Sequence, residues 1–383
     1  MALDWRVSFD AGAGFVTLPD VQNIFISRGR RRIIDPFQVE TCEITSRNPD
    51  GWTNTPQVGM PILAYVYGVY SPPNPTDVYW PMFQGTISDV KIDYGLTPSM
   101  DVVTIYCEGL QAAFGRAQLT NESFIQQNVG DTYYDVADRL GLPITWGSIV
   151  TSSINSVITN FNGNALDFVN TLVYTEQGLL RSTTGSTSTL EIGSLDFVGR
   201  DVMFSGAATP PEFNDGTVAP PYVDYAFNYD RLEFRSAAED FYNEVTVQPA
   251  GLANQTANTG TTPFTTYVLN TVDYTNDQAF QLANYVLNNF LDPDSAIRSI
   301  SARVDTQINL NLLIILLSQQ WTDVTRIIFR GDVYNVTMQG WVITATPGDQ
   351  TRVTLFTAAG DTNAYLRLND VFYGRLDYNR LGF

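Results

Sequence analysis

The sequence predicts a mainly β protein with α/β insertions, in which one chain carries two related β-barrel domains. Three observations lead to this prediction. Runs of β-branched and aromatic residues, punctuated by Gly, Pro, Asn and Asp, fill most of the chain. Only three segments have the apolar spacing of amphipathic helices. A five-residue pattern in the first quarter of the chain also recurs near its end.

The clearest strands lie in the first part of the chain. Residues 62–70 form a run of aliphatic residues and tyrosines, which ends at Ser71-Pro72-Pro73-Asn74-Pro75. Prolines cannot continue a strand ladder, so this cluster predicts a loop. Residues 83–90 and residues 101–107 predict the next two strands.

Three helices are expected, over residues 131–140, 164–176 and 277–290. Their predicted N-caps are, in chain order, Asp131 or Thr132, then Asn164, then Thr275 or Asn276. The Asn/Thr/Gly-rich residues 251–263 predict a mobile loop instead.

A weak internal repeat suggests how the domains are arranged. Phe83-Gln84-Gly85-Thr86-Ile87 is similar to Met338-Gln339-Gly340-Trp341-Val342, and a β-rich run precedes and follows each. We expect a first β-barrel domain over residues 1–115 and a middle α/β region over residues 116–230. A second β-barrel domain, with the long helix and a C-terminal tail, is expected over residues 231–383.

Composition argues against several function classes. The formal net charge is −19, which disfavours binding of nucleic acid or anionic lipid by the protein as a whole. Without histidine the chain lacks the commonest general base and metal ligand. The longest apolar run, residues 312–317, is far below the ~20 residues of a membrane span. We therefore expect no enzyme activity, metal, cofactor or membrane insertion, and synthesis in a cytoplasm because no secretory signal is recognisable.

Cys42 and Cys107 both fall in strand-like segments. Buried free thiols and a disulfide are both compatible with this placement.

An ordered series of segments resembles one family. It comprises residues 21–32, 37–44, 46–52, 83–89 and 240–247, and the closing residues 368–383, which are the most specific. The last segment ends in Tyr373-Gly374-Arg375-Leu376-Asp377, followed by Leu381-Gly382-Phe383. The series is similar to the hub proteins of phage tail tips, which include the baseplate hub of contractile tails. The likeness is greatest to minor tail proteins of long-tailed phages of actinobacteria.

The resemblance implies a baseplate-hub-like fold and a homotrimer around the tail axis, closing the tail tube. Three chains with two barrels each would adapt a sixfold tube to a threefold tip. Implied partners are a distal tail or tube-end protein, the tape-measure protein, and a central fibre or receptor-binding minor tail proteins. DNA would pass through the lumen without specific binding. The implied location is the virion tail tip, and residues 240–247 would open the second barrel.

The dense basic cluster at Arg28, Arg30, Arg31 and Arg32 is the candidate site. One interpretation is contact with DNA or the tape-measure terminus in the lumen. The other is ion pairing with an acidic face of a neighbouring subunit.

Three rival functions stay open at this point. A sixfold ring protein at the tube end would differ in copy number. A receptor-binding adhesin would use the tyrosines of residues 65–70 and 222–229 to stack on sugars. A cell-wall hydrolase would need a carboxylate pair, drawn from Asp89, Asp93, Asp101 and Glu108.

Overall fold

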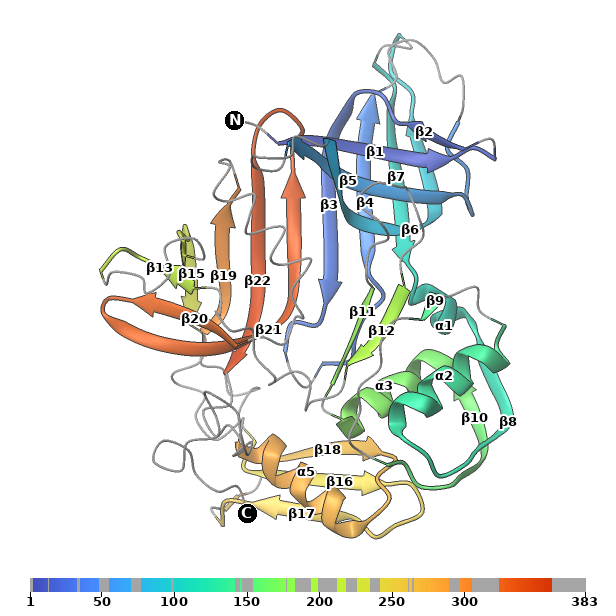
Figure 1. The fold of residues 1–383 in the computed structure, drawn as a ribbon, viewed down its shortest axis with the longest axis vertical. Coiled ribbons are helices and arrows are strands. Elements are labelled where there is room, and N and C mark those ends of the chain that lie inside the picture. The colour runs from blue at the N-terminus through green and yellow to red at the C-terminus, as the bar shows by residue number, and fades with distance from the viewer. Residues whose placement is uncertain are drawn as a thin grey trace.

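A computed structural model describes the protein and confirms the mainly β class (Figure 1). The described residues are 3–12, 14–32, 35–47, 55–69, 77–97, 100–141, 145–146, 154–176, 178–182, 194–198, 212–217, 226–234, 242–260, 262–263, 265–288, 297–304 and 324–359. The predicted segments at residues 71–75, 312–317 and 368–383 lie outside these ranges.

The first seven strands form the N-terminal strand group. They are β1 (Asp4–Asp10), β2 (Phe15–Thr17), β3 (Val21–Gly29), β4 (Thr41–Arg47), β5 (Pro61–Val69), β6 (Asp77–Asp93) and β7 (Val102–Gly109). Their order in the sheet is β3-β4-β7-β6-β5-β1-β2, and neighbouring strands are antiparallel. The predicted strands at residues 62–70, 83–90 and 101–107 are confirmed as β5, β6 and β7.

Seven later strands form the C-terminal strand group. They are β13 (Glu212–Asn214), β14 (Ala226–Phe227), β15 (Arg231–Phe234), β19 (Ile297–Arg303), β20 (Val324–Phe329), β21 (Asp332–Ala345) and β22 (Thr351–Ala359). Their order is β15-β19-β22-β21-β20-β13-β14.

The two strand groups have the same order. When each group is numbered along the chain, the order in both is third, fourth, seventh, sixth, fifth, first, second. The repeated pattern lies on the sixth strand of each, with Gly85 on β6 and Gly340 on β21. One difference is that β13 pairs in parallel with β20, whereas β1 pairs antiparallel with β5. The internal repeat is thus present in the topology, while closure of each group into a barrel and the three domain boundaries stay predictions.

One strand pairing joins the two groups into a 14-stranded sheet. β3 pairs antiparallel with β21, from Ile24 opposite Ala345 to Gly29 opposite Gly340. The backbones are close here, because a Cβ added at Gly340 would lie 2.6 Å from the carbonyl oxygens of Arg28 and Arg30. Gly340 is therefore needed for space.

A helical region covers one end of the sheet. It contains α1 (Ala112–Arg116), α2 (Val129–Arg139) and α3 (Ala165–Glu176), with β8 (Gln118–Phe124), β9 (Thr145–Trp146), β10 (Ile158–Asn164), β11 (Leu179–Ser182) and β12 (Ser194–Val198). The Asn164 cap of α3 is confirmed, since Leu166 N donates to Asn164 Oδ1 at 2.9 Å. The cap predicted for α2 was wrong: α2 begins at Val129, and Thr132 is buried, donating from Oγ1 to Asn155 Oδ1 at 2.7 Å.

A separate layer lies farthest from β1 and β2 in Figure 1. It consists of β16 (Glu244–Pro249), β17 (Gln255–Asn258), β18 (Thr266–Thr271) and α5 (Asn276–Asn288). The cap of α5 is confirmed: Gln278 N donates to Thr275 Oγ1, and Thr275 N donates to Gln278 Oε1, both at 3.2 Å.

Two predictions for this layer were wrong. Residues 240–247 do not open a second barrel, because β16 pairs only with β17 and β18 among the described strands. Its Val245 and Val247 pack on α5 in a core of their own. Residues 251–263 are not simply a loop, since β17 lies within them and pairs antiparallel with β16.

The two cysteines face each other across β4 and β7. Cys42 lies opposite Cys107, both are buried, and both are free thiols. Burial, followed by the contact with Cys107, raises the pKa of the Cys42 thiol well above its usual value.

We predict that neither thiol reacts with iodoacetamide at pH 8 in the native protein, and that both react in denaturant. The thiolate is the reactive form, and burial disfavours it. Because the folded-state pKa of Cys42 is raised, stability should be full below the unfolded thiol pKa and decrease as the pH rises above it. Mass spectrometry of the alkylated chain measures the labelling, and rapid modification of either cysteine in the native protein would contradict the buried pair.

We also predict that Gly340→Ala lowers the free energy of unfolding by about 1–3 kcal/mol, as overpacking does. Gly115→Ala is the matched control, because the nearest atom to its added Cβ is 3.7 Å away. Urea unfolding measures both variants. Equal unfolding midpoints would show that β3 and β21 do not approach this closely.

Candidate functional site: the arginine segment beside the β3–β21 pairing

The arginine segment lies where β3 meets β21. β3 ends at Gly29, so Arg28 lies within the strand and Arg30 directly follows it. Arg28 is 5% exposed and Arg30 3% exposed, whereas Arg31 is exposed and Arg32 is partly buried. The structure thus divides the predicted cluster into two buried and two accessible arginines.

Arg28 occupies a buried polar centre between the two strand groups. Its Nε lies 2.9 Å from Glu40 Oε1, and both side chains are almost fully buried. Its guanidinium carbon lies 5.0 Å from the ring centroid of Trp341 on β21. Nη2 donates to the carbonyl oxygen of Met82 on β6, at 3.4 Å. One cation therefore contacts both groups.

Glu40 is held in place by the chain after β7. Gln111 Nε2 donates to Glu40 Oε1 at 3.2 Å, and the Glu40 N–H donates to Gln111 Oε1 at 3.2 Å. The carbonyl oxygen of Glu40 accepts from the Gly109 N–H at 2.7 Å. These bonds orient the carboxylate toward Arg28, which compensates part of the cost of burying both charges.

Arg30 extends the contact between the groups. Its backbone N–H donates to the carbonyl oxygen of Gln339 at 3.0 Å, and its Nε donates to Gln339 Oε1 at 2.9 Å. Its guanidinium carbon lies 4.6 Å from the ring centroid of Phe37. Burial lowers the pKa of Arg30 to about 10, and nearby Tyr174 offsets part of that shift. Nη1 is buried and has no hydrogen-bond partner among the described residues.

The other two arginines remain at the surface. Arg31 lies over the ring of Phe356 on β22, 5.5 Å from its centroid. Arg32 forms an ion pair with Asp35 at 2.8 Å. A subunit-interface or lumen role for the four arginines stays a prediction, and Arg31 and Arg32 are the two that solvent or a neighbouring molecule reaches.

The candidate carboxylates have local partners. Asp93 pairs with Lys91 at 2.8 Å, Asp101 Oδ1 accepts from the Gly95 N–H at 2.8 Å, and Glu108 pairs with Arg116. Asp89 Oδ1 accepts from the adjacent Val90 N–H at 2.8 Å. Each contact joins residues no more than 8 positions apart along the chain, which favours structural roles for these groups.

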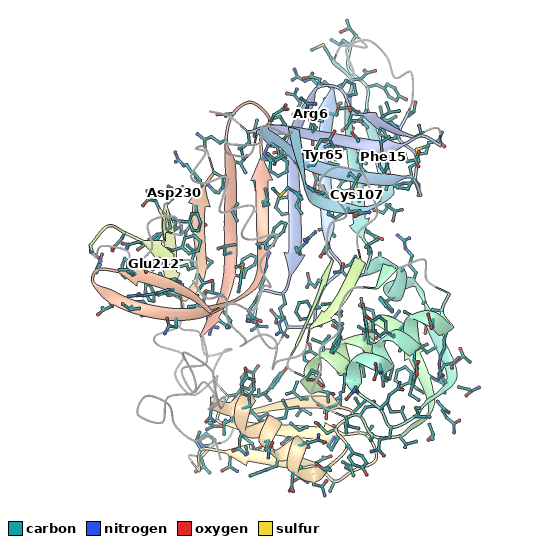
Figure 2. The ribbon with its side chains drawn as sticks, in the orientation of Figure 1. Arg6, Phe15, Tyr65, Cys107, Glu212 and Asp230 are labelled. Carbon is teal, nitrogen blue, oxygen red and sulfur yellow. The ribbon has the colours of Figure 1, made fainter. Side chains whose placement is uncertain are left out.

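Two of the candidate sugar-stacking tyrosines also make contacts within the fold. Tyr65 on β5 is buried, and its hydroxyl lies 3.1 Å from Ser8 Oγ, so it is a core side chain (Figure 2). The Tyr229 hydroxyl donates to the carbonyl oxygen of Ile328 at 3.1 Å. Residues 222 and 225 lie outside the described ranges.

The described ranges hold neither a metal-binding cluster nor a membrane-spanning helix. No group of three or more His, Cys, Asp or Glu side chains there is placed to hold a metal ion. No helix in the same ranges has the length and apolarity to cross a membrane.

Several solved structures of tail proteins have a fold similar to that of this chain. A tail protein from Neisseria meningitidis MC58 has a TM-score of 0.60 at 13% identity, over 93% of this chain and 96% of that chain. The 43 kDa tail protein of prophage MuSo2 from Shewanella oneidensis has a TM-score of 0.59 at 10% identity, covering 94% and 98%. Prophage tail protein gp18 from Listeria monocytogenes EGD-e has 0.52 at 11%, covering 94% and 95%.

No protein-family model and no curated protein sequence matches this chain. The structural matches show that the chain shares the fold of these tail proteins over nearly its whole length. The predicted resemblance to phage tail proteins is therefore confirmed in the fold.

We predict that Glu40→Gln lowers the free energy of unfolding by about 3–5 kcal/mol, because it leaves the Arg28 cation buried without a counter-charge. Asp4→Asn is the control. It removes an Arg6–Asp4 pair whose side chains are 40% and 48% exposed, and it should cost no more than about 1 kcal/mol.

A second variant shows whether the loss of stability comes from the unpaired buried charge or from a disturbed core. Replacing both members, Arg28→Met with Glu40→Met, should recover much of the loss, because no buried charge remains. Urea unfolding measures all four chains. If Glu40→Gln costs no more than Asp4→Asn, water reaches the pair and it does not stabilise the fold.

Proposed function

We propose that this protein is a tail-tip hub subunit of a phage: a structural, non-enzymatic homotrimer that closes the tail tube. The observation that carries the proposal is the duplicated strand order inside one chain. The shared fold with three tail proteins, two of them from prophages and each covered almost completely, supports placement in a tail.

The duplication accounts for a change of symmetry. Three chains with two similar strand groups each present six similar surfaces toward a sixfold tube. The same three chains present one copy of every other surface three times, toward a threefold tip. A single gene product then adapts one symmetry to the other.

The proposed partners follow from this position. The hub docks a distal tail or tube-end protein above and the tape-measure terminus in the lumen. Below it anchors a central fibre or receptor-binding minor tail proteins. Of the four arginines, Arg31 is exposed and Arg32, which pairs with Asp35, is partly exposed, so these two would face a neighbour or the lumen. We also propose that acidic residues behind the net charge of −19 line the lumen, where they repel DNA phosphates and let the genome pass; an acidic outer surface is the alternative.

The duplication also argues against the alternative function of a sixfold ring protein at the tube end. A sixfold ring protein needs one strand group per chain, because six copies already match the tube. Two groups in one chain favour three copies. The adhesin alternative has less support because Tyr65, one of its candidate sugar-stacking residues, is buried.

Electron cryo-microscopy of the intact tail tip, reconstructed without imposed symmetry, tests the proposal. We expect three copies around the axis, each with two strand groups that superpose. Six copies, a position on a fibre, or absence from the particle would contradict the hub function.

A further inference from the structure

We propose that a pocket between α3 and β18 binds a sugar unit that carries a carboxylate, of the hexuronic acid class. This binding function goes beyond the hub proposal and does not depend on it. The two tyrosines that line the pocket, Tyr174 and Tyr267, lie outside the tyrosine-rich segments at residues 65–70 and 222–229.

One face of a helix and the edge of a sheet form the pocket. α3 and β18 lie side by side, because the Val272 N–H, directly after β18, donates to Thr175 Oγ1 at 3.0 Å (Figure 1). β18 is an edge strand among the described residues, since it pairs with β16 alone. The cavity has a volume of about 320 Å³, at the lower end of the range of small-ligand sites. Its lining residues are Pro36, Asp167, Asn170, Thr171 and Tyr174, with residues 267–270 of β18.

A buried cation beside this pocket has an unused hydrogen-bond donor. Arg30 is 3% exposed, and its charge acts on both Tyr174 and Tyr267. Its Nε donates to Gln339 Oε1, while Nη1 has no hydrogen-bond partner among the described residues. An unpaired buried donor on a charged group is costly, so an anionic acceptor supplied by a ligand would relieve that cost.

The carboxylates near the pocket do not supply this acceptor. Asp35 is engaged by Arg32, whose Nε, Nη2 and backbone N–H donate to it at 3.0, 2.8 and 3.1 Å. Burial lowers the pKa of Arg30, and Asp35 offsets that shift less than the nearby tyrosines do. Asp167 is exposed and lies in the first turn of α3, where the helix dipole favours a carboxylate. The charge of Arg30 is therefore left for a ligand.

The tyrosines add no negative charge to the pocket. Burial raises the pKa of Tyr174 to about 12, and Arg30 offsets part of that shift. Burial also raises the pKa of Tyr267. Both phenols therefore stay protonated at neutral pH, and their partly exposed rings offer apolar surface to the C–H groups of a sugar.

The other lining residues favour a sugar over a simple anion. Asp167 and Asn270 are exposed and Thr171 is partly exposed, so they present donors and acceptors that match sugar hydroxyls. Asp167 precedes Tyr174 by two helical turns, about 10 Å, which keeps its negative charge away from the end of the pocket near Arg30. A neutral sugar would leave Arg30 unpaired, and an anion without hydroxyls would leave the polar lining unpaired. A carboxylated sugar satisfies both.

The helix that lines the pocket also positions the cation. The Phe37 N–H donates to Asn170 Oδ1 on α3 at 3.1 Å. The ring of Phe37 in turn lies 4.6 Å from the guanidinium carbon of Arg30. α3 thus fixes Arg30 through Phe37 before any ligand binds, which lowers the entropic cost of binding.

Saturation-transfer NMR with the full-length chain tests the pocket. The probe is methyl glucuronide, and the control probe is methyl glucoside, which has a hydroxymethyl group in place of the carboxylate. We expect saturable binding of the glucuronide. The glucoside should bind at least about tenfold more weakly, because it cannot accept a charge-assisted hydrogen bond from Arg30.

Variants locate the site. Thr171→Trp fills the cavity and should abolish binding, whereas Gln281→Trp, at an exposed position of α5 outside the pocket, is the matched control and should leave binding unchanged. Arg30→Gln should make the two probes bind equally, and Arg30→Lys should restore part of the preference. Circular dichroism checks that each variant is folded. Because Arg30 also bonds to Gln339, Thr171→Trp keeps the test decisive if Arg30→Gln does not fold.

Four results would overturn the proposal. They are no saturable binding of the glucuronide, equal binding of both probes by the unchanged chain, and glucuronide binding that persists in Thr171→Trp. The fourth is competition by N-acetyl-diglycine as strong as that of the glucuronide, which would identify the ligand as the end of a polypeptide chain. None of these results bears on the hub function, which the tail-tip reconstruction tests separately.

Discussion

The pairing of β3 with β21 is the constraint on which the rest of the structure depends. It joins two strand groups of the same order into one sheet, and it requires two backbones to approach at Gly29 and Gly340. The Arg28–Glu40 pair lies beside it, with Trp341 covering the cation from the second group. Both charges of this pair lie on the N-terminal group, and the contacts of Arg28 with Trp341 and of Arg30 with Gln339 tie that group to the second one.

This rigidity suits a mechanical component. In the proposed tail-tip hub, a subunit that closes the tube would transmit force without changing its internal geometry, so movement is expected between copies rather than within one. The buried arginines hold the two halves of each chain together.

Local patterns in the sequence predicted local structure well. The strands at β5, β6 and β7 and the caps of α3 and α5 depend on neighbouring residues, which the sequence displays directly. The repeated Gln-Gly pattern indicated the duplication, because Gly340 meets a steric demand that its neighbours do not. The assignment of residues 240–247 to a second barrel rested on the family resemblance, and it was wrong because β16 pairs with β17 and β18 and packs on α5.

The candidate site was predicted only in part. Four arginines were identified from their density in the sequence, yet their burial depends on partners far along the chain. Glu40 carries no motif, and Gln339 and Trp341 lie about 300 residues from the arginines they contact. Pairings of such long range follow from topology, which composition and spacing do not contain.

The same long separation has a consequence for synthesis on the ribosome. At about 5–20 residues per second, β21 emerges some 15–60 seconds after β3, so the edge of β3 waits unpaired while the middle of the chain is made. During that interval Arg28 and Arg30 are positive charges on an open edge, where charge suppresses association with other nascent chains. Residues that are structural in the finished protein thus serve first as protection against aggregation.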